Sequence, residues 1–170
     1  MTEMTSMPSN GAELLEDLDT RWREFVVYVD SLTHERWTVP ADPAGWTASD
    51  HVAHVTAWDQ AVAALLRDRT PEQRTLRVSD AAWAAGMGAI NEEIRQRTKG
   101  RPVATLKSER NATFAELRDV VAGFSDEDLE RPGGEFGLDE DGKCLREVLV
   151  SYLGGHYDEH RQYIATLVDG

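Results

Sequence analysis

The chain has 170 residues, 41% of them hydrophobic and 29% charged, and its formal net charge is −13. This length and composition allow one folded domain with a buried core, which excludes a disordered protein and a small disulfide-stapled one. The negative charge repels phosphate backbones and the 18 lysines and arginines form no basic stripe, so we expect no binding to nucleic acid.

The first two predicted helices are separated by a proline-containing loop. Apolar residues spaced three and four apart predict a helix over residues 11–32: Leu14, Leu15, Leu18, Trp22, Phe25, Val26, Val29 and Leu32. Two prolines then end the helical pattern and make "ADPAGW" a loop. Thr47 can cap the second helix, with Asp50 reaching back from three residues later, and the pattern runs to about residue 67.

Three more helices are predicted in the remainder of the chain. Ser79 begins one over residues 79–98, whose apolar side is formed by Trp83, Met87, Ile90 and Ile94. An amphipathic segment follows at 103–124, then a short capped turn, "SDEDLE", and a glycine-rich acidic loop. The final helix is expected over residues 143–168.

These elements predict an all-α fold, a four-helix bundle with residues 79–98 as an auxiliary helix in the longest connection. We expect one domain over residues 1–170, with residues 1–10 flexible. No apolar run is long enough for a membrane span and "MTEMTSMPSN" has no export signal, so we expect no membrane contact and a cytoplasmic location. Bundles build their sites from side chains that point inward from facing helices, which makes the direction of each histidine decisive.

Three histidines are predicted to point into the bundle. His156 and His160 lie one helical turn apart in the apolar stripe of the final helix, where an uninterrupted core would have leucine. On the second helix His54 precedes Trp58 by four residues, so it also faces inward. His51 shares this side but falls in the first turn, where solvent is nearer.

Three inward imidazoles are costly to bury unless each ring nitrogen has a partner. A divalent metal supplies one partner to all three, and three neutral nitrogen ligands leave a fourth position open, as in catalytic zinc sites. Imidazole also suits nickel, copper and iron. Glu159, three residues after His156, is either a group that orients a ligand or accepts a proton, or a solvated carboxylate. The alternative to a metal is that each histidine bonds a backbone carbonyl or a tyrosine such as Tyr152 or Tyr163.

Four other parts of the sequence also carry predictions. Cys144 is the single cysteine, so it excludes an intramolecular disulfide and a cysteine-rich zinc site and is expected to be a packing residue. Arg110 falls on an apolar helical line, where it either anchors a substrate anion or extends outward to solvent. "HYDEH" matches the HxxEH protease pattern, but too few residues follow it to supply a third ligand, so we expect no peptidase. "GLDEDGK", with acidic residues at 139, 140 and 141, lacks EF-hand spacing and is expected to be a solvated loop.

With these residues in hand, the sequence resembles the DinB/YfiT-like superfamily, which includes the N-terminal domains of mycothiol-dependent maleylpyruvate isomerases and the bacillithiol transferases. The resemblance rests on "GWTASDHVAHVTAWD", "AINEEI" and "GGHYDEHRQYI" and covers nearly the whole chain. It implies a four-helix bundle with a divalent metal, often zinc or nickel, held by one histidine of the second helix and two ligands of the last. By position these are His54, His156 and His160, the same three that the helical stripes select.

The resemblance also implies a function. We expect a metal-dependent enzyme that acts on a small-molecule substrate, a thiol-dependent S-transferase or isomerase that uses a low-molecular-weight thiol of the mycothiol or bacillithiol type. The sequence departs from the maleylpyruvate isomerases in ending at Gly170, so we expect it to share their metal and not their particular substrate. The alternatives are a non-catalytic stress-response bundle that sequesters a metal or ligand, and a dimerisation module with an empty site. A homodimer is compatible with the sequence.

Overall fold

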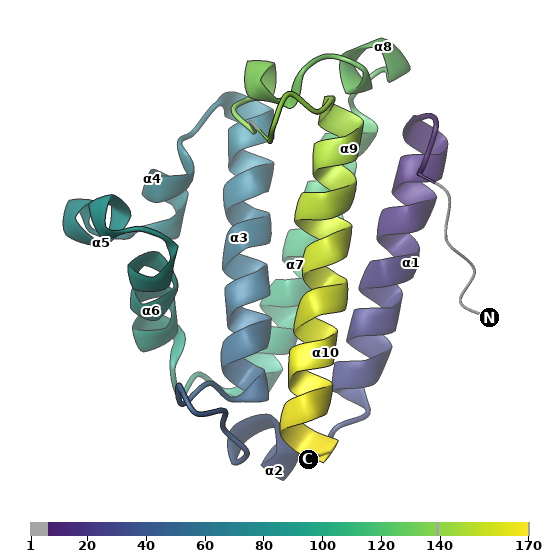
Figure 1. The fold of residues 1–170 in the computed structure, drawn as a ribbon. Helices are drawn as coiled ribbons and strands as arrows, with labels where there is room; N and C mark the ends of the chain where they lie inside the picture. Colours follow the sequence, from purple (N-terminus) through teal and green to yellow (C-terminus); the bar gives the residue numbers. More distant parts are fainter. Residues whose placement is uncertain (1–6, 139, 170) are drawn as a thin grey trace.

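The computed structural model describes residues 7–138 and 140–169 and forms a bundle of four long helical rods (Figure 1). The rods are α1 (Gly11–Asp30), α3 (Ala48–Asp68), α7 (Val103–Ala122) and a C-terminal rod made of α9 (Leu145–Leu149), the π-helix η2 (Val150–Gly155) and α10 (His156–Asp169). The described residues contain no β-strand, only an isolated bridge between Pro132 and Cys144. The predicted all-α four-helix bundle is therefore confirmed.

Short helices fill the connections between the rods. They are α2 (His34–Thr38), α4 (Glu72–Leu76), α5 (Asp80–Ala85), α6 (Met87–Thr98), α8 (Asp126–Leu129) and the 3-10 turn η1 (Gly133–Phe136). Across the described residues, no helix combines the length and the apolar character needed to cross a bilayer. The expected flexibility of residues 1–10 falls partly on residues 1–6, and the expected solvated acidic loop includes Asp139; both lie outside the described residues.

Helix α3 is the central element of the bundle. It packs against α7 and α10 on one side and against α4 and α6 on the other, and its side chains are buried almost all round (Figure 1). A helix that is covered on every face needs apolar side chains around its whole circumference, which explains the alanine and valine content of α3. The predicted capping box is present: the Thr47 hydroxyl accepts from the Asp50 N–H (3.3 Å), and the Asp50 carboxylate accepts from the Thr47 N–H (2.9 Å).

The prediction of one continuous helix over residues 79–98 is wrong. The helix divides into α5 and α6 at Gly86, whose φ of +99° belongs to a region that side-chain-bearing residues rarely adopt. The break separates two parts of the predicted apolar side. Ile90 and Ile94 are buried against α3, whereas Trp83 and Met87 are 38% and 56% exposed.

A π-helix interrupts the C-terminal rod immediately before the two histidines of α10. Such wide turns are rare, occur mostly as single turns within α-helices, and are frequent at functional sites. Gly154 lies in this turn against α1, and a Cβ atom there would stand 2.7 Å from Cδ of Arg21. The absence of a side chain at Gly154 therefore lets Arg21 cross between the two rods and bond both Asp17 (2.9 Å) and Asp158 (2.6 Å).

Candidate metal centre

Four histidine rings meet between α3 and α10. His54, His156 and His160 each place one ring nitrogen within 4.8 Å of a ring nitrogen of the other two. Nε2 of His54 is 3.0 Å from Nε2 of His156, and Nδ1 of His51 is 2.9 Å from Nδ1 of His160. The structure therefore brings together the three histidines that the sequence selects and adds a fourth beside them.

The expectation that His51 lies nearer to solvent is wrong, because its side chain is only 5% exposed. The loop before α3 covers it, with the Trp46 ring centroid 5.3 Å away. A hydrogen bond between two Nδ1 atoms requires one ring to donate and the other to accept. If His160 donates, its Nε2 keeps a free lone pair, so His51 is well placed to orient His160 as a metal ligand.

The histidines are held in their neutral forms. Burial, reinforced by the neighbouring rings, lowers the pKa of His54 to about 2, and burial lowers the pKa of His156 to about 4. Burial also moves the pKa of His160 far below its ordinary value and lowers that of His51. Neutral imidazole is the form that binds a metal, so no proton has to be removed near pH 7.

The donor set fits a divalent ion. His54 directs Nε2 at His156, while its Nδ1 is buried without a hydrogen-bond partner, so Nε2 is the nitrogen that would bind the ion. The 3.0 Å between the facing nitrogens of His54 and His156 is close to the ~3.3 Å that bonds of about 2.0–2.1 Å give two tetrahedral ligands. The two tyrosines expected as alternative partners of the histidines donate their hydrogen bonds elsewhere. Tyr163 donates to Glu159 (2.6 Å) and Tyr152 donates to Glu72 (3.4 Å).

A cavity of about 1470 Å³ lies over the histidines. This is larger than most small-molecule sites, which commonly measure about 300–1,000 Å³. Besides the four histidines, its walls carry aromatic and acidic side chains: Trp46, Trp58, Tyr152, Tyr163, Asp42, Asp158 and Glu159. The arrangement can hold a small molecule against a cluster of nitrogen ligands.

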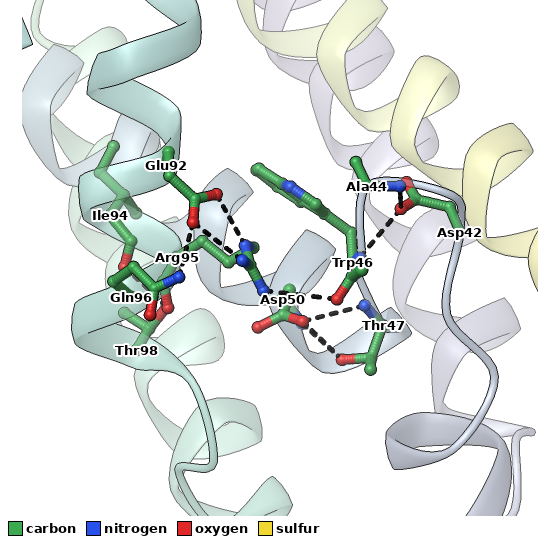
Figure 2. Close-up of polar contacts among 11 residues, drawn as sticks. Asp42, Ala44, Trp46, Thr47, Asp50, Glu92, Ile94, Arg95, Gln96 and Thr98 are labelled. Carbon is green, nitrogen blue, oxygen red and sulfur yellow. Dashed lines mark hydrogen bonds and ion pairs between the residues drawn. The ribbon is translucent and has the colours of Figure 1, made fainter.

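The loop that forms one wall of this cavity is fixed from both sides (Figure 2). Oδ1 of Asp42 accepts hydrogen bonds from the backbone N–H groups of Ala44 and Trp46, both at 2.9 Å. From α6, Arg95 donates to the carbonyl of Gly45 at 3.4 Å while it pairs with Glu92. Asp42 and Trp46 therefore present their side chains from a braced loop.

The remaining predicted residues have different surroundings. Glu159 is exposed at the wall of the cavity, where it accepts the hydrogen bond from Tyr163. Arg110 is buried and does not line the cavity; its guanidinium pairs with Asp30 at 3.0 Å. This ion pair accounts for the arginine on an apolar helical line, and the side chain, 3% exposed, does not extend to solvent.

A buried polar pair, Tyr157 and Asp59, lies beside the histidines and was not predicted from the sequence. The Tyr157 hydroxyl on α10 donates to Oδ2 of Asp59 on α3 at 2.9 Å, and Oδ1 of Asp59 has no partner. Burial raises the pKa of Asp59 to about 8, while the hydrogen bond from Tyr157 acts in the opposite direction. The available signals were an isolated carboxylate in the apolar run of α3 and a tyrosine four residues after Leu153 in the final stripe.

Replacing Asp59 with asparagine should change how stability depends on pH. Because the folded pKa lies above the unfolded value of about 3.9, the native protein binds the extra proton between roughly pH 4 and 8. The contribution of Asp59 therefore lowers the stability of wild type as pH rises through this window, opposite in sign to the contribution of the histidines, and Asp59→Asn removes it. Between pH 5 and 8 the variant should gain on the order of 2–4 kcal/mol relative to wild type.

Urea unfolding at several pH values measures this difference directly. Asp119→Asn, the same substitution at an exposed position of α7, is the matched control and should run parallel to wild type. A constant offset between Asp59→Asn and wild type across the range would show that Asp59 is ionised in the native protein.

Comparison with known proteins places this fold in a family. The DinB superfamily profile matches residues 17–164. A Streptococcus pneumoniae protein of known structure is 16% identical, with a TM-score of 0.75 and coverage of 97% of this chain and 93% of that one. An uncharacterised protein from Clostridium difficile 630 is also 16% identical, with a TM-score of 0.74 and coverage of 94% and 95%.

The chain is also similar to the colibactin self-resistance protein ClbS, whose structure was solved in complex with double-stranded DNA. The two are 12% identical, with a TM-score of 0.70 and coverage of 97% of this chain and 99% of that one. No curated protein matches the chain. At these identities the structural likenesses show a shared fold alone. The profile match, which spans most of the sequence, shows that the chain belongs to the DinB superfamily.

Proposed function

We propose that the protein is a divalent-metal-dependent enzyme that acts on a small molecule, either transferring a low-molecular-weight thiol to an electrophile or isomerising a thiol adduct. The observation that carries the proposal is the convergence of three neutral imidazoles, two buried and that of His156 partly buried, beneath a large open cavity. Their nitrogens suit zinc or nickel.

The four histidines and Glu159 would have different roles in this reaction. His54, His156 and His160 would hold the metal, and His51 would orient His160 through the bond between their Nδ1 atoms. A metal bound there lowers the pKa of a thiol so that the sulfur is a nucleophile near neutral pH. Glu159 lines the cavity and is hydrogen-bonded to Tyr163, from where it can take up the proton that the thiol loses.

The cavity favours a small-molecule ligand over a nucleic acid. ClbS was solved with DNA, but the present chain carries a net charge of −13 and presents three carboxylates in the cavity wall. A phosphate backbone would be repelled from both. The proposed substrate is therefore a small molecule.

The test begins with the metal content of the purified protein and continues with turnover. We expect about one zinc or nickel ion per chain, and accelerated consumption of mycothiol, bacillithiol or glutathione with a panel of electrophiles. Glu159→Gln should lower the rate while it keeps the metal, because the amide still accepts from Tyr163 but takes no proton. Metal without turnover for any thiol would instead support a non-catalytic, ligand-sequestering bundle, and protein without metal affinity would overturn the proposal.

A further inference from the structure

The charged side chains around the cavity all have one sign. Asp42, Asp158 and Glu159 line it, and no lysine or arginine does so among the described residues. The carboxylates come from different elements, since Asp42 lies in the loop before α3 and the other two lie on α10. Two separate elements therefore contribute acidic side chains to the wall.

The three carboxylates differ in how far neighbouring cations offset their charge. Asp158 bonds Arg21 at 2.6 Å and lies 3.8 Å from Arg161, so its charge is largely compensated. Asp42 uses its Oδ1 for backbone N–H groups and Glu159 accepts from a neutral hydroxyl, and neither has an ion pair within 4.0 Å among the described residues. Asp42 and Glu159 therefore supply the negative field of the cavity.

Aromatic rings reinforce this preference. Trp46 and Trp58 line the cavity beside His54, with ring centroids 5.4 Å and 6.4 Å from its own, and Tyr163 stands at the wall. The faces of such rings attract cations and pack against uncharged apolar groups, whereas they offer nothing to an anion.

We propose that the cavity selects thiols whose far end is uncharged or positively charged and rejects thiols that carry a carboxylate there. This inference rests on the proposed function, because it assigns a ligand class to the same site. The selecting residues are Asp42 and Glu159, which oppose a negative group by charge alone and need no direct contact with it.

Three probes of similar size test the inference. Cysteamine, N-acetylcysteamine and 3-mercaptopropionate share a two-carbon thiol and end in a cation, a neutral amide and a carboxylate. Their dissociation constants can be measured on the cobalt(II)-loaded protein from the sulfur-to-cobalt absorption band, with calorimetry as a second readout. Because the thiols differ in acidity, the decisive quantity is how each affinity changes between wild type and variant.

Asp42→Asn and Glu159→Gln remove one charge each and keep the acceptor atoms that the local hydrogen bonds use. We expect each substitution to increase the affinity for 3-mercaptopropionate by roughly 3- to 10-fold and to decrease the affinity for cysteamine by a similar factor. The affinity for N-acetylcysteamine should stay within about 2-fold of its wild-type value. High salt should shrink these differences. Glu127→Gln, an exposed position of α8 outside the cavity, is the matched control and should change none of the three.

The outcomes separate this inference from the proposed function. If the substitutions change the affinities for all three thiols equally, or change none of them, the charge selection is overturned, but metal binding and thiol binding are not. If no thiol produces the absorption band in wild type although cobalt(II) binds, the thiol-dependent function fails and the selection fails with it.

Discussion

Replacing His160 with alanine is expected to abolish tight binding of a divalent metal. His160 lies at the centre of the cluster, with its ring centroid 4.6 Å from that of His54, 4.5 Å from that of His156 and 5.1 Å from that of His51. Loss of an outer-shell partner commonly lowers metal affinity 10–100-fold, so loss of a ligand should lower it by more than about 100-fold. Competition with a chromophoric chelator for zinc or cobalt(II) measures this loss.

His34 supplies the matched control. It lies on α2, is exposed and belongs to no histidine cluster, so His34→Ala should bind metal as wild type does. Circular dichroism and unfolding at pH 7.5 would show that His160→Ala remains folded. Wild-type affinity in a folded His160→Ala variant would contradict the three-histidine site.

The metal-free protein is expected to unfold in mild acid. Because burial lowers the pKa values of His51, His54, His156 and His160 on folding, the unfolded chain binds more protons than the native protein below the ordinary histidine value of about 6.5. The contribution of the four histidines to stability is therefore complete above pH 6.5 and is lost as pH decreases, and it outweighs the opposite contribution of the single Asp59 carboxyl. Each fully titrating histidine contributes up to about 1.4 kcal/mol per pH unit, so several together should remove more than about 5 kcal/mol between pH 6.5 and 4.5.

Urea unfolding with and without zinc tests this expectation. The zinc-free protein should show the steep loss, and saturating zinc should move it to lower pH, since protons and metal compete for the same nitrogens. Without metal, His160→Ala should show a shallower dependence, by about 1.4 kcal/mol per pH unit. A zinc-free protein equally stable at pH 4.5 and 7 would show that the histidines are protonated inside the fold or accessible to solvent.

The sequence predicted those features that depend on helical periodicity. The stripe of the first helix and the capping box at Thr47 are local patterns, and α1 and α3 follow them closely. The inward direction of His54 and His160 followed from the same periodicity. In each case the neighbours that decide the outcome lie within one or two helical turns.

The features that the sequence did not predict depend on contacts between distant segments or on one exceptional residue. The partner of Asp59 is 98 residues away, and the cover over His51 comes from a loop that Arg95 braces from α6. Gly86 interrupts a segment whose periodicity otherwise continues. The π-turn at Val150–Gly155 leaves no distinctive pattern, because its two glycines are equally compatible with an α-helix packed closely against α1.

The apolar core of the bundle bears on whether a metal ion would bind before or after the chain folds. Leucines, valines and aromatic residues from all four rods interlock without any contribution from the histidine nitrogens: for example Leu14, Phe25, Val52, Leu117, Leu149 and Ile164. In a zinc finger the ion drives the chain to fold, whereas this core leads us to expect that the bundle folds without an ion near neutral pH. A metal ion held by the histidines would therefore be loaded onto, exchanged within or removed from an already assembled protein, and the cellular supply would decide which metal is bound.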